Sequence, residues 1–240
     1  MLASPSPPIR QLGPIVVPPR TLGRSDCPHE RQTAAAVLSQ NLGPECRGRD
    51  GCLAALLAIL DGEADPDVLH AILCALGHLK HPGGIEPALP FVDHADPDVR
   101  FGAIHALMGQ DDDRAISGLI RLSRDPVAEN RDWATFALGS MTDRDTPELR
   151  AALADRLRDD DPTTAGEALV GLARRRDPRA LPVLRNLLET GEAGSLACEA
   201  AELLADPDLL PLLFALGPSP GEDSSSLRAA IAACASPATG

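Results

Sequence analysis

Apolar and polar positions alternate along the chain with the period of amphipathic helices. In the segment from Asp96 to Gly109, one helical face is apolar, and its residues are Val99, Ala103, Ala106 and Leu107. After a short polar loop, the next segment has a second apolar face, formed by Ile116, Leu119 and Ile120 together with Ser123. This pattern predicts a helix, a loop and a second helix.

The same pattern recurs through most of the chain. The two most similar copies read DPDVLHAILCALGHL from Asp65 and DPDVRFGAIHALMGQ from Asp96, at an offset of 31 residues. Equivalent leucines in five copies are Leu76, Leu107, Leu138, Leu172 and Leu204. Neither helix of such a unit can bury its apolar face alone, so consecutive units must stack. The sequence therefore predicts an all-α fold, a right-handed α-solenoid of stacked antiparallel helix pairs.

Most copies begin with the dipeptide Asp-Pro. It occurs at residues 65, 96, 125, 161, 177 and 206. An Asp side chain can accept hydrogen bonds from the first turn of a helix, and proline at the first helical position loses no hydrogen bond. We therefore predict that all six dipeptides start helices, with about 1 kcal/mol lost when one cap is removed.

The repeats divide the chain into three parts. Residues 1–29 are rich in proline and are expected to be largely disordered, and residues 30–216 are expected to form six helix pairs, one of whose second helices covers 84–94. Residues 217–240 are expected to be a linker and a short helix that caps the last pair.

The copy at residues 96–109 resembles the short HEAT-like repeats of bacterial proteins, the type named after the phycobilisome lyases. The residues that match its motif are Asp96, Pro97, Val99, Arg100, Ala103, Ala106 and Leu107. Other copies are looser, and Leu69 replaces the motif arginine in the copy at 65–79. The resemblance implies a HEAT-like or armadillo-like superhelix in which the second helices line the concave face. It says much less about activity.

Composition narrows the possible functions. The net charge is −13, which disfavours nucleic acid and anionic membranes as partners. The longest apolar run, Leu53 to Leu60, is far too short to span a bilayer. The proline-interrupted start does not resemble a secretory signal, and the six cysteines form no CxxC pair. We therefore expect a cytoplasmic, monomeric protein whose cysteines are free thiols.

Candidate reactive groups are sparse. No GxGxxG, Walker loop, GxSxG or HExxH motif is present, so we expect no catalytic residue and no cofactor. His78 with His81, and His70 with Cys74, have spacings compatible with a metal ion. The dipole at a helix C-terminus and the apolar packing of Cys74 explain these residues better, and we expect no metal site. The pair Asp132-Trp133 is similar to residues of HEAT-like DNA glycosylases. Trp133 aligns with Gly102 beside the apolar stripe, which favours a packing role.

A surplus of arginine in the second helices is the remaining candidate binding feature. The segment 114–124 carries a charge of +3, and the segments 146–158 and 178–189 each carry +1. We name these arginines the basic strip and expect them to bind a partner: Arg114, Arg121, Arg124, Arg150, Arg158 and Arg185.

The leading hypothesis is a non-catalytic scaffold or adaptor that binds a protein partner on the concave face. A regulatory or toxin-neutralising inhibitor belongs to the same class, because an acidic surface suits a basic target. Two alternatives come from the resemblance and from the basic strip. They are a bilin lyase or chromophore-handling factor and a nucleic-acid-binding protein of the DNA-repair type.

Overall fold

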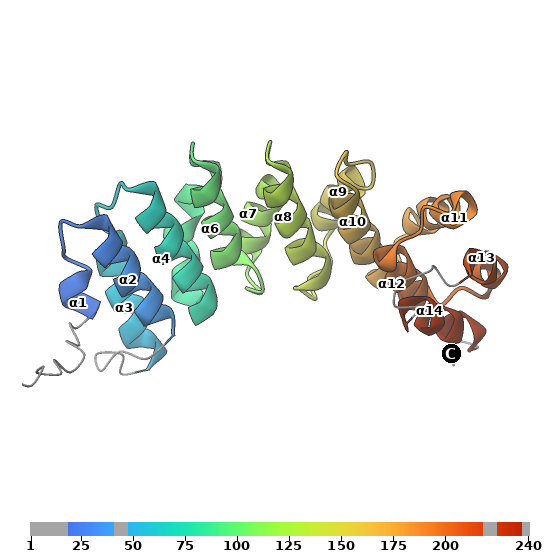
Figure 1. Ribbon diagram of the computed structural model, residues 1–240, viewed down its shortest axis with the longest axis horizontal. Helices are drawn as coiled ribbons and strands as arrows, with labels where there is room; N and C mark the ends of the chain where they lie inside the picture. The colour runs from blue at the N-terminus through green and yellow to red at the C-terminus, as the bar shows by residue number, and fades with distance from the viewer. Residues whose placement is uncertain (1–18, 41–47, 218–224, 237–240) are drawn as a thin grey trace, which may run out of the picture.

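A computed structural model describes residues 19–40, 48–217 and 225–236 of the chain. Within these ranges the chain is helical and contains no strand. Successive helix pairs stack side by side into an elongated, bent array (Figure 1). The predicted α-solenoid is therefore confirmed. Residues 1–18, most of the segment expected to be disordered, lie outside the described ranges.

The helices form two rows. The first helices of the pairs, with the last helix of the chain, are α2 (Pro28–Ser39), α4 (Pro66–Leu79), α6 (Pro97–Leu107), α8 (Ala128–Ser140), α10 (Pro162–Arg174), α12 (Ser195–Leu204) and α14 (Ser225–Ala235). The second helices are α3 (Arg49–Leu60), α5 (Ile85–Ala88), α7 (Asp113–Leu122), α9 (Pro147–Arg156), α11 (Ala180–Thr190) and α13 (Leu210–Leu216). A short helix, α1 (Pro19–Leu22), precedes α2. Three 3₁₀ turns flank α5 and α13: η1 (Pro82–Gly84), η2 (Leu89–Asp93) and η3 (Pro207–Leu209).

The first helices pack more closely than the second helices do. A Cβ atom on Gly77 of α4 would lie 2.2 Å from the carbonyl oxygen of His105 in α6, and one on Gly171 of α10 would lie 2.6 Å from the Cα of Gly139 in α8. In a bent two-layer stack, the more closely spaced layer lies inside the bend. Figure 1 agrees at the C-terminal end, where α12 and α14 lie inside α11 and α13. The first helices form the inner row, whereas the resemblance implied that the second helices would.

Buried ion pairs link several repeats. The guanidinium of Arg100 in α6 donates to both carboxylate oxygens of Asp125, over 2.6 and 2.9 Å, and also to the carbonyl oxygen of His94. Arg131 makes the same two-point contact with Asp159. These contacts lower the carboxyl pKa of Asp125 and of Asp159. We call each such pair a clamp, because it fixes a first helix to the loop that leads into the next one.

Four of the six Asp-Pro dipeptides cap helices as predicted. They are Asp65, Asp96, Asp161 and Asp206, each of which accepts a backbone N–H at the start of α4, α6, α10 or η3. The prediction is wrong for Asp125 and Asp177, because α8 begins at Ala128 and α11 at Ala180. The carboxylate of Asp125 is bound by Arg100, and that of Asp177 by Arg150 and Arg179.

The predicted helix over 84–94 is broken into η1, α5 and η2. Pro90 has no N–H to continue an α-helical ladder, and its ring opposes the carbonyl four residues earlier, so the chain tightens into a 3₁₀ turn. None of the described helices combines the length and apolar character that crossing a membrane requires.

Cys52 is buried and disulfide-bonded, so the expectation of free thiols is wrong for this residue. It holds for Cys27, Cys74 and Cys234, which are free thiols.

Candidate functional site

Aromatic side chains gather on the inner row, over α4, α6 and α8. The aromatic cluster, as we call it, consists of His70, Phe101, His105, Trp133 and Phe136. All five are only half-buried, and neighbouring rings are stacked, tilted or edge to face, with centroids 4.8 to 6.1 Å apart. The chain has one tryptophan, four phenylalanines and no tyrosine, so this is an unusual concentration.

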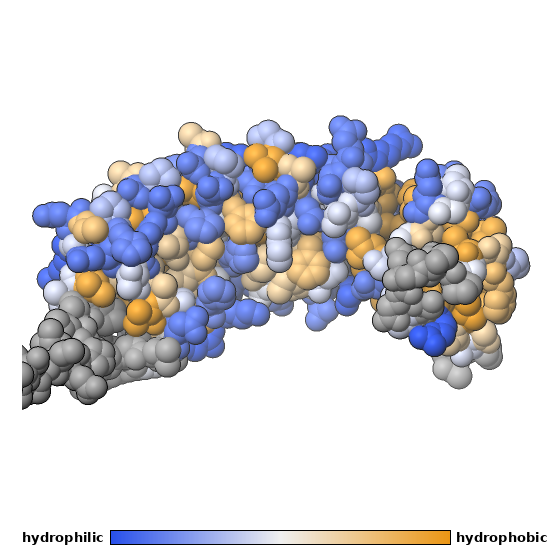
Figure 2. All heavy atoms as spheres, viewed as in Figure 1, coloured by the Kyte–Doolittle hydropathy of each residue, from blue (hydrophilic) through white to orange (hydrophobic). Residues whose placement is uncertain are grey.

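The cluster exists because Trp133 stands where α6 has a glycine. Trp133 and Gly102 lie five residues before Leu138 and Leu107, at equivalent places in the repeat. The Trp133 ring meets Phe101 at 6.1 Å and His105 at 5.6 Å between centroids. Trp133 therefore packs against its neighbours as expected, but at the surface between two helices rather than in the core. In the view of Figure 2, apolar residues surface along the middle of the array between hydrophilic ones.

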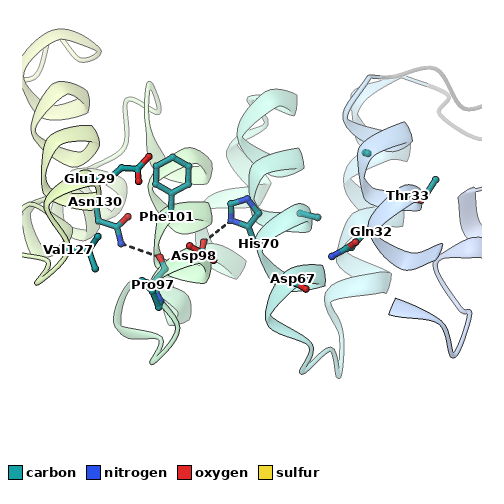
Figure 3. A pocket seen from close by; sticks show the side chains of 12 residues that line it. Gln32, Thr33, Asp67, His70, Pro97, Asp98, Phe101, Val127, Glu129 and Asn130 are labelled. Carbon is teal, nitrogen blue, oxygen red and sulfur yellow. Dashed lines mark hydrogen bonds between the residues drawn. The ribbon is translucent and has the colours of Figure 1, made fainter. Parts of the chain in front are cut away.

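An open groove runs beside the cluster, along the N-terminal ends of α2, α4, α6 and α8 (Figure 3). Its volume is about 610 Å³, and His70, Phe101 and Asn130 are among its lining residues. Nδ1 of His70 lies 2.7 Å from the carbonyl oxygen of Asp98, and Nδ2 of Asn130 donates to the carbonyl oxygen of Pro97 over 3.1 Å. These bonds fix polar side chains of α4 and α8 against α6, so the groove wall is held in place by contacts between repeats.

Toward the C-terminal end, the same face of the array carries carboxylates. We name Asp132 of α8, Glu167 of α10 and Glu199 of α12 the acidic row. Burial, together with the charges of Asp132 and Glu199, raises the pKa of Glu167 to about 7. Burial and the neighbouring carboxylates Asp161 and Glu129 also raise the pKa of Asp132. Sequence reasoning missed this row, although Glu167 and Glu199 each lie five residues before an equivalent leucine, the place that Trp133 holds in α8.

Three histidine and cysteine side chains of the inner row, those of His70, Cys74 and His105, lie close together and are partly buried. Nε2 of His70 lies 3.6 Å from Sγ of Cys74, and burial raises the pKa of the Cys74 thiol to about 11. Burial, with the nearby His78 and His70, lowers the pKa of His105. Within the described residues, no group of three or more histidine, cysteine, aspartate or glutamate side chains is placed to hold a metal ion.

The structure places the basic strip on the outer row and in its turns. Five of its arginines contact carboxylates of the chain: Arg114 contacts Glu86 and Asp112, Arg121 contacts Asp93, Arg124 contacts Asp155, Arg150 contacts Asp145 and Asp177, and Arg185 contacts Asp208. Arg158 is exposed in the turn after α9. Most of the strip is therefore neutralised by neighbouring second helices or the loops beside them.

Comparison with known proteins agrees with this architecture. Two segments, 53–139 and 119–205, match the family model described as HEAT repeats. Protein YibA of Escherichia coli (strain K12) is 34% identical over 116 residues, which are 48% of this chain and 41% of that protein. The YibA of Escherichia coli O157:H7 matches to the same extent, so this chain aligns with less than half of either relative.

Solved structures show the same fold. The X-ray structure of the Escherichia coli YibA superposes with a TM-score of 0.73 and 23% identity, covering 90% of this chain and 79% of that one. A designed armadillo repeat protein in complex with the peptide (KR)4 has a TM-score of 0.56 and 20% identity, covering 78% and 98%. Since the HEAT model matches well over half of the sequence and the helix pairs stack as that repeat requires, the chain belongs to the HEAT-repeat family.

Proposed function

We propose that this chain is a non-catalytic scaffold that binds an extended segment of a partner protein along α4, α6, α8 and α10. The aromatic cluster is the observation that carries the proposal. Tryptophan and other large half-buried side chains at the centre of a surface dominate the energy of protein interfaces. A stacked array also offers a long surface without needing a reactive group.

The acidic row favours protein over nucleic acid on this face. A phosphate backbone laid along it would meet Asp132, Glu167 and Glu199, which repel it. The designed armadillo protein described above is in complex with the peptide (KR)4, so a stack of the same general fold can accept a peptide. The basic strip stays a prediction, as do the cytoplasmic location and the monomeric state.

The single tryptophan provides a direct test. Peptides selected from a displayed library on the wild-type chain are measured by the change in Trp133 fluorescence and by calorimetry. We expect calorimetry to show that the Trp133→Ala variant binds the selected peptides about tenfold or more weakly than the wild type does. The matched control is Phe214→Ala, which removes an aromatic residue that is 65% exposed on α13. Peptides that bind Trp133→Ala as tightly as the wild type would contradict the proposal.

The same peptides distinguish the two faces. Arg121→Glu combined with Arg158→Glu reverses two exposed charges of the basic strip. Arg150 is left intact because it contacts the buried carboxylate of Asp177. We expect this double variant to bind like the wild type, and a large loss would instead assign binding to the outer row.

A further inference from the structure

Most carboxylates of the outer row contact a cation of the chain, whereas several carboxylates of the inner row make no ion pair in the part of the chain that the structure describes. Within the described residues, the carboxylates of α4 to α12 on the inner row that make no ion pair are Asp67, Asp98, Glu129, Asp132, Glu167, Glu199 and Glu202. Of the arginines in the inner helices α4 to α12, Arg100 and Arg131 are occupied in the clamps, and Arg174 is exposed at the C-terminal end of α10. The inner row is thus a face with uncompensated negative charge.

Asp132 marks the place where this charge meets the aromatic cluster. Its Oδ1 atom is shielded from solvent and has no hydrogen-bond partner among the described residues. A shielded carboxylate oxygen without a donor is costly, because it has given up water without replacement. Trp133 follows it in sequence, and Glu167 occupies the place equivalent to Trp133 on α10, the helix that packs against α8.

We propose that the partner segment carries a lysine or arginine whose cationic group lies against Trp133 and contacts the carboxylates of Asp132 and Glu167. This inference rests on the proposed function and specifies the chemistry of the residue bound at its centre. The aromatic face attracts a cation through its quadrupole, and the aliphatic stem of the same side chain packs on neighbouring rings. The carboxylates supply the hydrogen-bond acceptors.

A purely apolar occupant fits this place poorly. It would cover Asp132 and Glu167 further without giving either oxygen a donor, which adds a desolvation cost. A cationic side chain removes that cost and also reduces the repulsion among the acidic row. Charge complementarity therefore selects a basic segment over an apolar or acidic one.

Binding of a cation here is coupled to a proton. The charged groups that act on Glu167 are Asp132 from α8 and Glu199 from α12, and no group of α9 or α11 contributes. Since burial, together with both neighbouring carboxylates, raises the pKa of Glu167 to about 7, the carboxyl is partly protonated near neutral pH and must ionise to pair with the ligand. Affinity for a basic peptide should therefore rise several-fold from pH 6 to pH 8, and this rise should be absent in Glu167→Gln.

The test uses the full chain and two peptides of equal length, (Lys-Arg)4 and (Gln-Ser)4, measured by calorimetry at pH 8. We expect (Lys-Arg)4 to bind the wild type, and the double variant D132N/E167Q to weaken it by about tenfold or more. We expect (Gln-Ser)4 not to bind measurably. The charge-matched control is E148Q/E189Q, which removes two exposed carboxylates from α9 and α11 of the outer row.

The outcomes separate this inference from the proposed function. Equal losses in D132N/E167Q and E148Q/E189Q would overturn the inference, because binding would then follow net charge alone. Failure of (Lys-Arg)4 to bind, while library-selected neutral peptides bind in a Trp133-dependent way, would overturn the inference and leave the proposed function standing. If no peptide depends on Trp133, both fall. Circular dichroism of each variant confirms that the helices are retained.

Discussion

The junction between α4 and α6 and the junction between α6 and α8 join equivalent helices in different ways. At the first, Gly77 and Gly102 let the helix backbones approach closely, and Leu69 stands where a clamp arginine would be. At the second, Trp133 replaces the glycine, the helices make far fewer contacts, and Arg100 clamps Asp125. One junction is held by close backbone packing and the other by an ion pair and aromatic contacts.

This difference connects packing to the candidate site. A tryptophan at the glycine position keeps α6 and α8 apart and leaves aromatic rings accessible between them. The repeats beyond α8 return to close packing, because Gly139 and Gly171 meet there. The looser junction is thus confined to the place where the aromatic cluster and the acidic row meet, which is the place where we propose binding.

Removing the clamp should have the largest effect. Arg100→Ala leaves the Asp125 carboxylate, 2% exposed, without its cation, and we expect about 3 kcal/mol lower unfolding free energy in urea denaturation. Leu69→Ala at the equivalent place in α4 tests apolar packing instead. A change below about 0.5 kcal/mol for Arg100→Ala would show that the clamp does not hold the junction.

The same clamp predicts a dependence on acid. The pKa of Asp125 is lowered in the folded chain, so its contribution is complete above the unfolded value of 3.8 and is lost as the pH falls through the folded value. The stability of the wild type should therefore drop more steeply below pH 4 than that of Arg100→Ala, as followed by thermal unfolding. Parallel curves would contradict this assignment.

The closely packed junction between α4 and α6 should lose stability when an atom is added. Gly77→Ala places a methyl group 2.2 Å from the backbone of His105, so α4 and α6 must separate, and we expect a loss of about 2 kcal/mol. Gly194→Ala is the matched control, since nothing lies within 4 Å of its Cβ position. If Gly77→Ala is as stable as the control, close approach is not what joins these repeats.

Much of the fold could be predicted from the sequence, because the leucine period and the helical apolar spacing are local signals that every copy repeats. The exceptions have physical causes. Asp125 and Asp177 look like caps, but Arg100 binds the first, and Arg150 together with the nearby Arg179 binds the second. Prolines broke the helix expected at 84–94. The distant arginine partners depend on tertiary contacts, whereas Pro87 and Pro90, which break the helix, stand in the sequence itself.

The candidate site was much less predictable. The net charge of the second helices predicts a binding role for the basic strip. A charge summed over one helix cannot show that Arg121 and Arg124 contact carboxylates of neighbouring units. Aligning the repeats with one another predicts that Trp133 lies beside the core. It does not predict the contacts with Phe101 and His105, which belong to another repeat. Only stacking brings these side chains, and the acidic row beyond them, onto one surface.

Replacing the tryptophan should separate packing from binding. Trp133 is half-buried, so Trp133→Ala should lower the unfolding free energy by only about 1–2 kcal/mol, well below the cost of emptying a core position. The loss of peptide affinity described above should be larger than this small loss of folding stability would explain. If the variant instead loses 4 kcal/mol or more, on the order of a fully buried tryptophan, Trp133 is a core residue and the junction is not relaxed for binding.

The smallest effect is expected at the edge of the relaxed junction, in Glu167. Its pKa of about 7 lies above the unfolded value of 4.5, so the folded chain binds the proton more tightly and loses stability as the pH rises through this window. Because water partly screens the group, we expect a loss of about 1 kcal/mol or less between pH 5 and pH 8. Glu167→Gln should remove that loss in thermal unfolding, whereas Glu148→Gln on the outer row should not. A wild-type curve as flat as that of Glu167→Gln would mean that the acidic row is already compensated within the chain, and the reason for it to bind a cation would disappear.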